Sequence, residues 1–211
     1  MIIKVCGMRE PENIRAVEAL GVDWIGLIFF PPSPRNVVSI PDSLSKQSQR
    51  VGVFVDADVE DIIQKVNMFH LDMIQLHGQE SPHFCHVLKQ RIPAHLKIIK
   101  MIPIATEDDI LLTHSYSNDI SYFLFESKVP TQGNAYGGSG QKFDWNILEL
   151  YQGYIPFLLT GGIDENDAER IAQFHHPQFV GIDLNSRFES SPAIKDISKL
   201  HSFIAKVRNL T

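Results

Sequence analysis

The strongest constraint on the fold is the alternation of short apolar runs with polar segments that have helical spacing. The runs are rich in β-branched and aromatic residues, and eight of them recur along the 211 residues: 2–5, 24–29, 51–55, 73–76, 98–102, 122–125, 157–160 and 179–182. Each is a continuous apolar stretch, as expected for strands of a parallel sheet buried on both faces. The sequence therefore predicts eight β-strands, each followed by a helical segment.

Most of the intervening segments carry helix signals. Pro11 suits a first helical turn, and Asp58 and Asp164 are predicted to cap the helices that follow them. Apolar stripes at helical spacing are formed by Ile14, Val17 and Leu20, by Ile62, Val66 and Phe69, by Ile171 and Phe174, and by Ile197, Leu200, Phe203 and Val207 after Pro192. The segments after Pro41 and from Asp144 are weaker, so short helices are expected in places.

Eight successive strand–helix units admit a closed barrel or a doubly wound sheet. The first apolar run ends Val5-Cys6-Gly7-Met8-Arg9, which is not the G-x-G-x-x-G turn typical of a doubly wound nucleotide-binding sheet. No Gly/Ser-rich linker or shift in composition divides the chain. We therefore predict a single α/β domain over residues 1–211, a (β/α)8 TIM barrel whose loops and some helices are short.

Composition limits the partners of such a barrel. The 19 basic and 25 acidic residues give a formal net charge of −6, and no basic patch suggests a nucleic-acid surface. No apolar run approaches the ~20 residues of a membrane span, and the chain enters a strand at once without a signal-peptide layout. The two cysteines are too few for a disulfide framework, so we expect a cytoplasmic protein that binds neither nucleic acid nor membrane.

Active sites of such barrels lie where strands end, and Cys6 is the first residue after the first strand. Two interpretations are open. Cys6 is a nucleophile or general base, which requires a lowered thiol pKa, or it is a small buried hydrophobe. Gly7 lets other atoms approach the backbone closely. Cys85 lies on a predicted helix beside Phe84 and Val87 and is expected to pack in the core.

Three further strand ends carry polar side chains. Arg35 follows a loop stiffened by three prolines, and it is either a clamp for a planar carboxylate or a solvated surface residue. His77 follows the fourth strand and is either a titratable site residue or a loop histidine bonded to the backbone. Glu126 ends the sixth strand as a candidate proton donor, unless it pairs with Lys128 or another base.

The loops after the last two strands predict a phosphate site. Gly161 and Gly162 leave backbone amides uncovered, and Asn185 and Ser186 offer amides and a hydroxyl. In many barrels these two loops hold a phosphate group, although ordinary tight turns have the same composition. Residues 137–140 form a glycine-dense segment that is either a lid or an anion-binding loop.

Several of these segments together resemble phosphoribosylanthranilate isomerase of tryptophan biosynthesis. The distinctive ones, in chain order, are Lys4-Val5-Cys6-Gly7, Pro32-Ser33-Pro34-Arg35, Gln75-Leu76-His77-Gly78, Gly137-Gly138-Ser139-Gly140 followed by Phe143-Asp144-Trp145, Thr160-Gly161-Gly162 and Gly181-Ile182-Asp183. The resemblance spans nearly the whole chain. It implies an Amadori rearrangement of N-(5-phosphoribosyl)anthranilate to its 1-deoxyribulose isomer, with no metal and no cofactor.

By position, the resemblance implies a general base at Cys6 and a general acid at Glu126. Arg35 would hold the anthranilate carboxylate, and His77 and Asp183 would support the substrate. The phosphate would bind at a set of four residues: Gly161, Gly162, Asn185 and Ser186. The only expected partner is the small phosphorylated substrate, bound by a monomer or a weak homodimer.

One departure from the family pattern affects the chemistry. The acid is normally an aspartate, and Glu126 moves the carboxyl by roughly one bond length, enough to cost on the order of 10²-fold in rate unless the pocket compensates. Two alternative functions therefore stay open. One is a catalytically weakened barrel that only binds a phosphorylated ligand. The other is the related isomerase of histidine biosynthesis, although that enzyme is expected to have a carboxylate where Cys6 stands.

Overall fold

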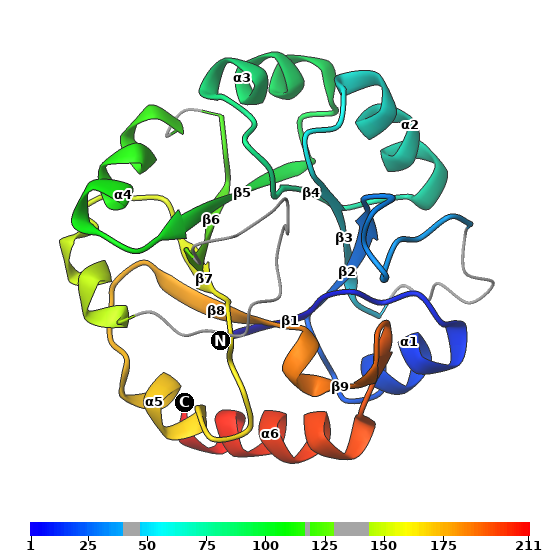
Figure 1. Ribbon diagram of the computed structural model, residues 1–211, viewed down its shortest axis with the longest axis vertical. Coiled ribbons are helices and arrows are strands. Elements are labelled where there is room, and N and C mark those ends of the chain that lie inside the picture. The colour runs from blue at the N-terminus through cyan, green and yellow to red at the C-terminus, as the bar shows by residue number, and fades with distance from the viewer. Residues whose placement is uncertain (40–46, 117–118, 129–143) are drawn as a thin grey trace.

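The computed structural model describes residues 1–39, 47–116, 119–128 and 144–211, and in these residues eight parallel strands close into a barrel (Figure 1). The strands follow one another around the barrel in chain order: β1 (Ile2–Val5), β2 (Trp24–Phe29), β3 (Gln49–Phe54), β4 (Met73–Leu76), β5 (Lys97–Ile104), β6 (Tyr122–Ser127), β7 (Phe157–Leu159) and β8 (Phe179–Leu184). β8 pairs with β1 and closes the ring. The predicted barrel is confirmed, and the predicted strand ends differ from the observed ones by no more than two residues.

Helices surround the barrel, and several are a single turn or two, as the chain length predicted (Figure 1). The α-helices are α1 (Pro11–Glu18), α2 (Val59–Phe69), α3 (Pro82–Arg91), α4 (Glu107–Leu111), α5 (Ala168–Gln173) and α6 (Ile197–Leu210). The 3-10 helices are η1 (Leu112–Tyr116), η2 (Trp145–Leu150) and η3 (Ser186–Phe188). No helix in the described ranges is long and apolar enough to cross a membrane.

Three of the predicted helix starts are confirmed and one is wrong. α1 begins at Pro11, as predicted. The Asp58 carboxylate accepts from the Asp61 amide and caps α2, and the Asp144 carboxylate caps η2. Asp164 does not cap α5, which begins four residues later at Ala168. The Asp164 carboxylate instead accepts from the Asn166 amide, so this segment is a turn. The weak segment after Pro41 falls outside the described residues at positions 41–46.

A short antiparallel hairpin, β9 (Glu189–Ser191) with β10 (Ile194–Lys195), lies between β8 and α6 and was not predicted. Its turn holds Ala193 at a φ of 68°. The carboxylate of Asp196 then caps α6 by accepting from the Lys199 amide, so the final apolar stripe is helical as predicted.

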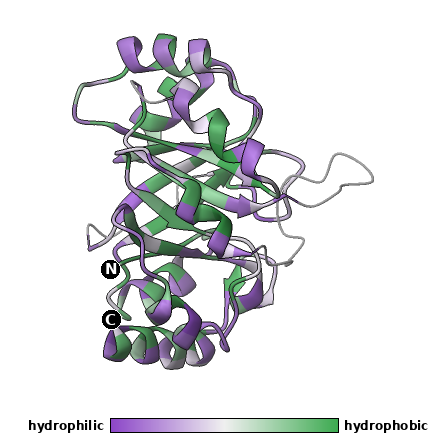
Figure 2. Ribbon diagram, turned by 90° about the vertical axis from the view of Figure 1, so that its left-hand side faces the viewer, coloured by the Kyte–Doolittle hydropathy of each residue, from purple (hydrophilic) through white to green (hydrophobic). Residues whose placement is uncertain are grey.

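Apolar side chains fill the space between barrel and helices and also plug one end of the barrel. The barrel strands are mostly hydrophobic, whereas the surrounding helices carry both hydrophobic and hydrophilic residues (Figure 2). Cys85 belongs to the outer cluster and is fully buried on α3, as predicted. The inner plug consists of Trp24, Val51, Met73, Ile99, Leu124 and Leu158. Side chains two residues further along a strand face the same interior, so the next layer, toward the carboxyl ends, includes Gln75 and Glu126. Space for a ligand is therefore left at the carboxyl ends of the strands.

Candidate active site

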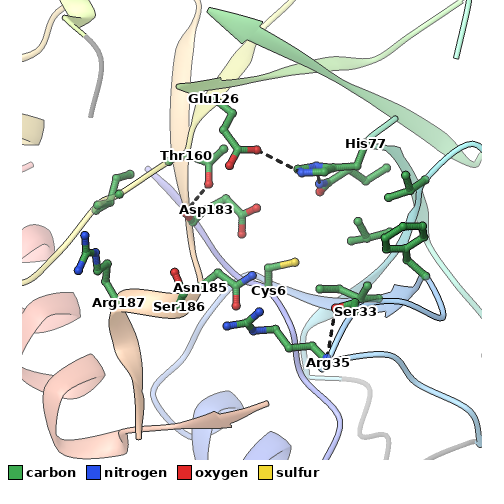
Figure 3. Close-up of a pocket in the computed structure, with 18 residues that line it drawn as sticks. Cys6, Ser33, Arg35, His77, Glu126, Thr160, Asp183, Asn185, Ser186 and Arg187 are labelled. Atoms are coloured by element: carbon green, nitrogen blue, oxygen red, sulfur yellow. Dashed lines mark hydrogen bonds and ion pairs between the residues drawn. The ribbon is translucent and has the colours of Figure 1, made fainter. Parts of the chain in front are cut away.

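A pocket opens at the carboxyl ends of the barrel strands, and its lining comes from the ends of these strands or from the residues directly after them, for every strand except β5 (Figure 3). The nine residues singled out from the sequence all line it: Cys6, Arg35, His77, Glu126, Gly161, Gly162, Asp183, Asn185 and Ser186. Elements far apart in the sequence therefore bring these side chains to one place. Their individual roles remain predictions.

Two glycines, Gly7 and Gly26, leave space around Cys6 for its side chain and its neighbours. A Cβ on Gly26 of the neighbouring strand would lie 2.8 Å from the Cys6 sulfur, so Gly26 leaves the room that the thiol occupies. Gly7 has a φ of +75°, which favours glycine, and a Cβ there would lie 2.7 Å from both Arg35 Cδ and Asn185 Oδ1. The expected close approach at Gly7 is thus made by two other residues of the pocket.

An ion pair lies beneath the thiol. Lys4, two residues before Cys6 on the same face of β1, donates from Nζ to Asp183 Oδ2 at 2.7 Å, and the two side chains are 1% and 5% exposed. Burial alone would lower the pKa of Lys4, but the charge of Asp183 and the neighbouring Cys6 sulfur raise it above its usual value. Asp183 Oδ1 is buried and has no hydrogen-bond partner among the described residues. This oxygen is therefore available to a ligand in the pocket.

The electrostatic environment of Cys6 differs from the sequence-based expectation. Burial raises the pKa of the Cys6 thiol, the nearby carboxylate of Asp183 raises it further, and Lys4 and Lys195 oppose the rise. The structure thus contradicts the lowered thiol pKa that a general base was expected to have. The thiol is held neutral there, beside two ammonium groups that stabilise the thiolate once it forms.

Glu126 lies across the pocket from Cys6 and contacts His77 (Figure 3). Its Oε2 lies 3.2 Å from His77 Nε2, and His77 Nδ1 lies 2.9 Å from Gln75 Nε2. A Cβ on Gly161 would lie 3.3 Å from Glu126 Cγ, so the two residues lie close together. The pairing of Glu126 with Lys128, one of the alternatives above, does not occur, because Lys128 pairs with Asp109 at 2.7 Å.

Arg35 reaches the pocket, but it is not a solvated surface residue. Its guanidinium makes a bidentate ion pair with Glu189, with Nε at 2.9 Å from Oε1 and Nη2 at 2.6 Å from Oε2. The hydrogen bonds to Glu189 raise the pKa of Arg35 above its usual value. A carboxylate ligand would therefore meet an arginine that already has one carboxylate partner.

The loops after β7 and β8 adjoin each other at the pocket wall. Gly161 and Gly162 have φ values of +87° and +72°, which residues with side chains rarely adopt. The Thr160 hydroxyl donates to the Asp183 carbonyl at 3.1 Å and ties the two loops together. Asn185 and Ser186 complete this wall, while the glycine-dense segment 137–140 lies outside the described residues.

Among the polar residues that sequence inspection did not assign to the site are Lys4, Gln75, Thr160, Glu189 and Lys195. Lys4 and Gln75 each stand two residues before a predicted site residue on the same strand, so the period of a strand could have found them. Thr160 directly precedes Gly161. Glu189 and Lys195 had no signal, because their approach to Arg35 depends on the unpredicted β9–β10 hairpin. Within the described ranges, no group of three or more His, Cys, Asp or Glu residues could hold a metal ion.

Comparison with known proteins decides the family. The family model for N-(5'-phosphoribosyl)anthranilate (PRA) isomerase matches residues 3–206. The chain belongs to the phosphoribosylanthranilate isomerase family. N-(5'-phosphoribosyl)anthranilate isomerases of Parabacteroides distasonis and Phocaeicola vulgatus are both 49% identical to it, over 98% and 99% of this chain and 93% and 98% of theirs. The phosphoribosylanthranilate isomerase structure from Thermotoga maritima is 26% identical, with a TM-score of 0.81 and coverage of 99% of this chain and 100% of that one.

Membership of the phosphoribosylanthranilate isomerase family confirms the resemblance drawn from the sequence motifs. These motifs converge in space: Lys4 to Gly7, the Arg35 loop, Gln75 to His77 and the two loops after β7 and β8 all border the one pocket or support it. The family match thus covers the residues that build the pocket as well as the barrel that carries them.

The charge environment of Cys6 predicts how the thiol titrates. Since burial raises its pKa, the thiolate should form with a midpoint above the ordinary value of 9.0. Thiolate ultraviolet absorbance is followed against pH, and the Cys6→Ser variant is subtracted as a blank for Cys85 and the tyrosines. A difference titration with its midpoint below 9.0 would contradict the environment described here.

Proposed function

We propose that this protein isomerises N-(5-phosphoribosyl)anthranilate to 1-(2-carboxyphenylamino)-1-deoxyribulose 5-phosphate by general acid–base catalysis, in the Amadori rearrangement of tryptophan biosynthesis. The observation that carries the proposal is the placement of Cys6 and Glu126 on opposite sides of one pocket, which also contains glycine-rich loops and Arg35 (Figure 3). An Amadori step needs an acid and a base on opposite sides of a sugar. It also needs a grip at each end of the substrate, so that the reacting carbons stay between them.

The acid acts first in this scheme. Glu126 in its protonated form donates a proton to the furanose ring oxygen, the bond from C1 to that oxygen breaks, and the anilino nitrogen lone pair forms a Schiff base at C1. Glu126 is left as a carboxylate 3.2 Å from His77 Nε2. If the Gln75 amide donates to His77 Nδ1, as the atoms are assigned, Nε2 carries the proton and donates to that carboxylate. His77 thus supports the acid by hydrogen bonding to its charged form.

The base acts next. Cys6 as thiolate removes the proton from C2, and the electrons of that C–H bond form the C1–C2 double bond while the Schiff base nitrogen becomes a neutral amine. The enolamine then tautomerises to the ketone at C2, so the substrate is isomerised with no net gain or loss of atoms. Lys4 and Lys195 lower the thiol pKa against the effect of burial, which supports formation of the thiolate in a closed pocket.

Two anionic groups anchor the substrate. The phosphate is assigned to the backbone and hydroxyl donors of Gly161, Gly162, Asn185 and Ser186, and the anthranilate carboxylate to Arg35. The unpartnered Oδ1 of Asp183 is well placed to accept a hydrogen bond from a ribose hydroxyl. A substrate held in this way spans the pocket between the thiol and the acid.

The alternatives are less well supported. The related isomerase of histidine biosynthesis is expected to have a carboxylate at the position of Cys6, and this chain matches the phosphoribosylanthranilate isomerase family instead. A barrel that only binds a phosphorylated ligand was suggested by Glu126, yet Glu126 lines the pocket and its carboxylate lies 3.2 Å from His77 Nε2, so the longer acid still reaches the site.

The activity and the base are tested together. Purified protein should convert the substrate, seen as loss of its anthranilate fluorescence, and the gene should restore growth of a tryptophan auxotroph that lacks the isomerase. Cys6→Ser should lower kcat by roughly 10²- to 10⁴-fold, because the hydroxyl is a far weaker base, while substrate affinity and Tm stay near wild type. Binding without turnover in the wild type would favour the binding-only alternative. Full activity of Cys6→Ser would refute the base assignment.

The acid is tested by two substitutions at Glu126. Glu126→Gln cannot donate the proton and should lower kcat by about 10²- to 10⁴-fold. Glu126→Asp should keep or raise the activity, because it restores the acid that the family normally has. Steady-state kinetics and thermal melting are measured for both. An active Glu126→Gln variant rules out the acid role, whereas loss of activity in Glu126→Asp alone would mean that the pocket has been rebuilt around the longer side chain.

A further inference from the structure

A buried cluster of charges lies behind Arg35, and its carboxylate, Glu189, takes no part in the chemistry described so far. Glu189 and Lys195, the first and last residues of the β9–β10 hairpin, have side chains that are 5% and 0% exposed, and they pair at 2.6 Å. Glu189 also pairs with Arg35, whose side chain is 17% exposed. Through Glu189, the hairpin therefore connects Arg35, which is assigned to the substrate carboxylate, to the buried ammonium group of Lys195.

The hydrogen bonds of Glu189 fix the orientation of the guanidinium. The Glu189 carboxylate accepts hydrogen bonds from one edge of the Arg35 guanidinium. Nε donates to Oε1 at 2.9 Å, and Nη2 donates to Oε2 at 2.6 Å. Nη1 donates to no other residue in the described part of the chain, so the outer edge formed by Nη1 and Nη2 remains for a second carboxylate. The stem of Arg35 packs closely against Gly7, where a Cβ would lie 2.7 Å from the Arg35 Cδ.

The hairpin residues are themselves held in place. Glu189 Oε1 accepts from Lys195 Nζ at 2.6 Å and from the Ala193 amide at 3.2 Å. Lys195 Nζ also donates to Asn185 Oδ1 at 2.8 Å, and the Lys195 backbone exchanges two hydrogen bonds with the Asn13 side chain of α1. The support behind Arg35 thus extends from α1 to the loop after β8.

The charges of the cluster favour an incoming anion. Burial alone would raise the pKa of Glu189, but hydrogen bonds from Arg35 and the charge of Lys195 hold it below its usual value, so Glu189 is ionised. Burial lowers the pKa of Lys195 below its usual value, and the charge of Glu189 opposes that fall. With Lys195 in its ammonium form, one carboxylate lies between two cations, which leaves a net positive charge. The negative charge that orients Arg35 is therefore offset by Lys195 and does not repel a substrate carboxylate.

We propose that Glu189, supported by Lys195, is a positioning residue that aims the outer edge of the Arg35 guanidinium at the substrate carboxylate and so sets selectivity for an ortho-carboxylated aromatic amine. This inference rests on the proposed function. Beyond that function, the inference says that selectivity for the substrate carboxylate depends on the β9–β10 hairpin, which lies outside the barrel strands. Glu189 itself does not touch the substrate.

The test compares two substrates that differ only in that carboxylate, N-(5-phosphoribosyl)anthranilate and N-(5-phosphoribosyl)aniline. Glu189→Gln keeps the size of the side chain and removes its charge. It should lower kcat/KM for the anthranilate substrate by about 10- to 100-fold, mainly through KM, because the grip is made in the ground state and the transition state alike. For the aniline substrate, which has no carboxylate for Arg35 to bind, kcat/KM should change less than about three-fold.

Glu169→Gln is the matched control. The Glu169 side chain is 69% exposed and pairs with Lys206, so this substitution should change kcat/KM for neither substrate.

A double-mutant cycle separates positioning from general damage to the fold. In an Arg35→Met background, adding Glu189→Gln should have little further effect on the anthranilate substrate, because Glu189 acts through Arg35. Glu189→Asp keeps the charge and shortens the side chain, so it should give an intermediate loss of kcat/KM that is confined to the anthranilate substrate. This variant replaces Glu189→Gln in the test if Glu189→Gln does not fold. Equal losses for both substrates, or additive effects in the cycle, would overturn the positioning role while leaving the isomerase assignment intact. A wild-type protein that converts neither substrate would overturn the proposed function and this inference with it.

Discussion

The pairing of β1 with β8 is the contact on which the site depends. It closes the barrel, and in its register Lys4 lies opposite Asp183. In the same register the Cys6 amide donates to the Leu184 carbonyl at 2.8 Å, so Cys6 stands at the point where the pairing of the two strands ends. An open sheet would leave these residues at opposite edges. Closure therefore creates the ion pair and brings the thiol next to it.

Two buried ion pairs bring positive charge close to the thiol. Lys4 with Asp183 and Lys195 with Glu189 are both nearly inaccessible, and each places an ammonium group near Cys6. A buried charge is strongly destabilising unless it is paired, so each lysine needs its carboxylate for the fold as well as for the site. With its partner in place, each ammonium group still opposes the rise in thiol pKa caused by burial. Stability and thiol chemistry are thus coupled through the same two ion pairs.

The barrel and most of the pocket were predictable because they follow from local pattern. Continuous apolar runs identified the strands, and the rule that barrel sites lie at strand ends selected Cys6, His77 and Glu126. What sequence inspection could not give are long-range pairings. Arg35 was expected to clamp a carboxylate or to be solvated, and its ion pair with Glu189, which lies 154 residues further along the chain, was not predicted. The direction of the Cys6 pKa shift was also missed, because it depends on how deeply the thiol is buried and on lysines that only the fold brings near it.

The central claim is that the substrate lies between Cys6 and Glu126, with its phosphate beside β7 and β8 and its carboxylate at Arg35. A crystal structure with the reduced product analogue bound tests it most directly. The account predicts phosphate oxygens on the amides of Gly161, Gly162 and Ser186, and the carboxylate on the outer edge of Arg35. The Cys6 sulfur and the Glu126 carboxyl should face the reacting carbons from opposite sides. A ligand whose reacting carbons are walled off from Cys6, or whose phosphate binds elsewhere in the barrel, would contradict it.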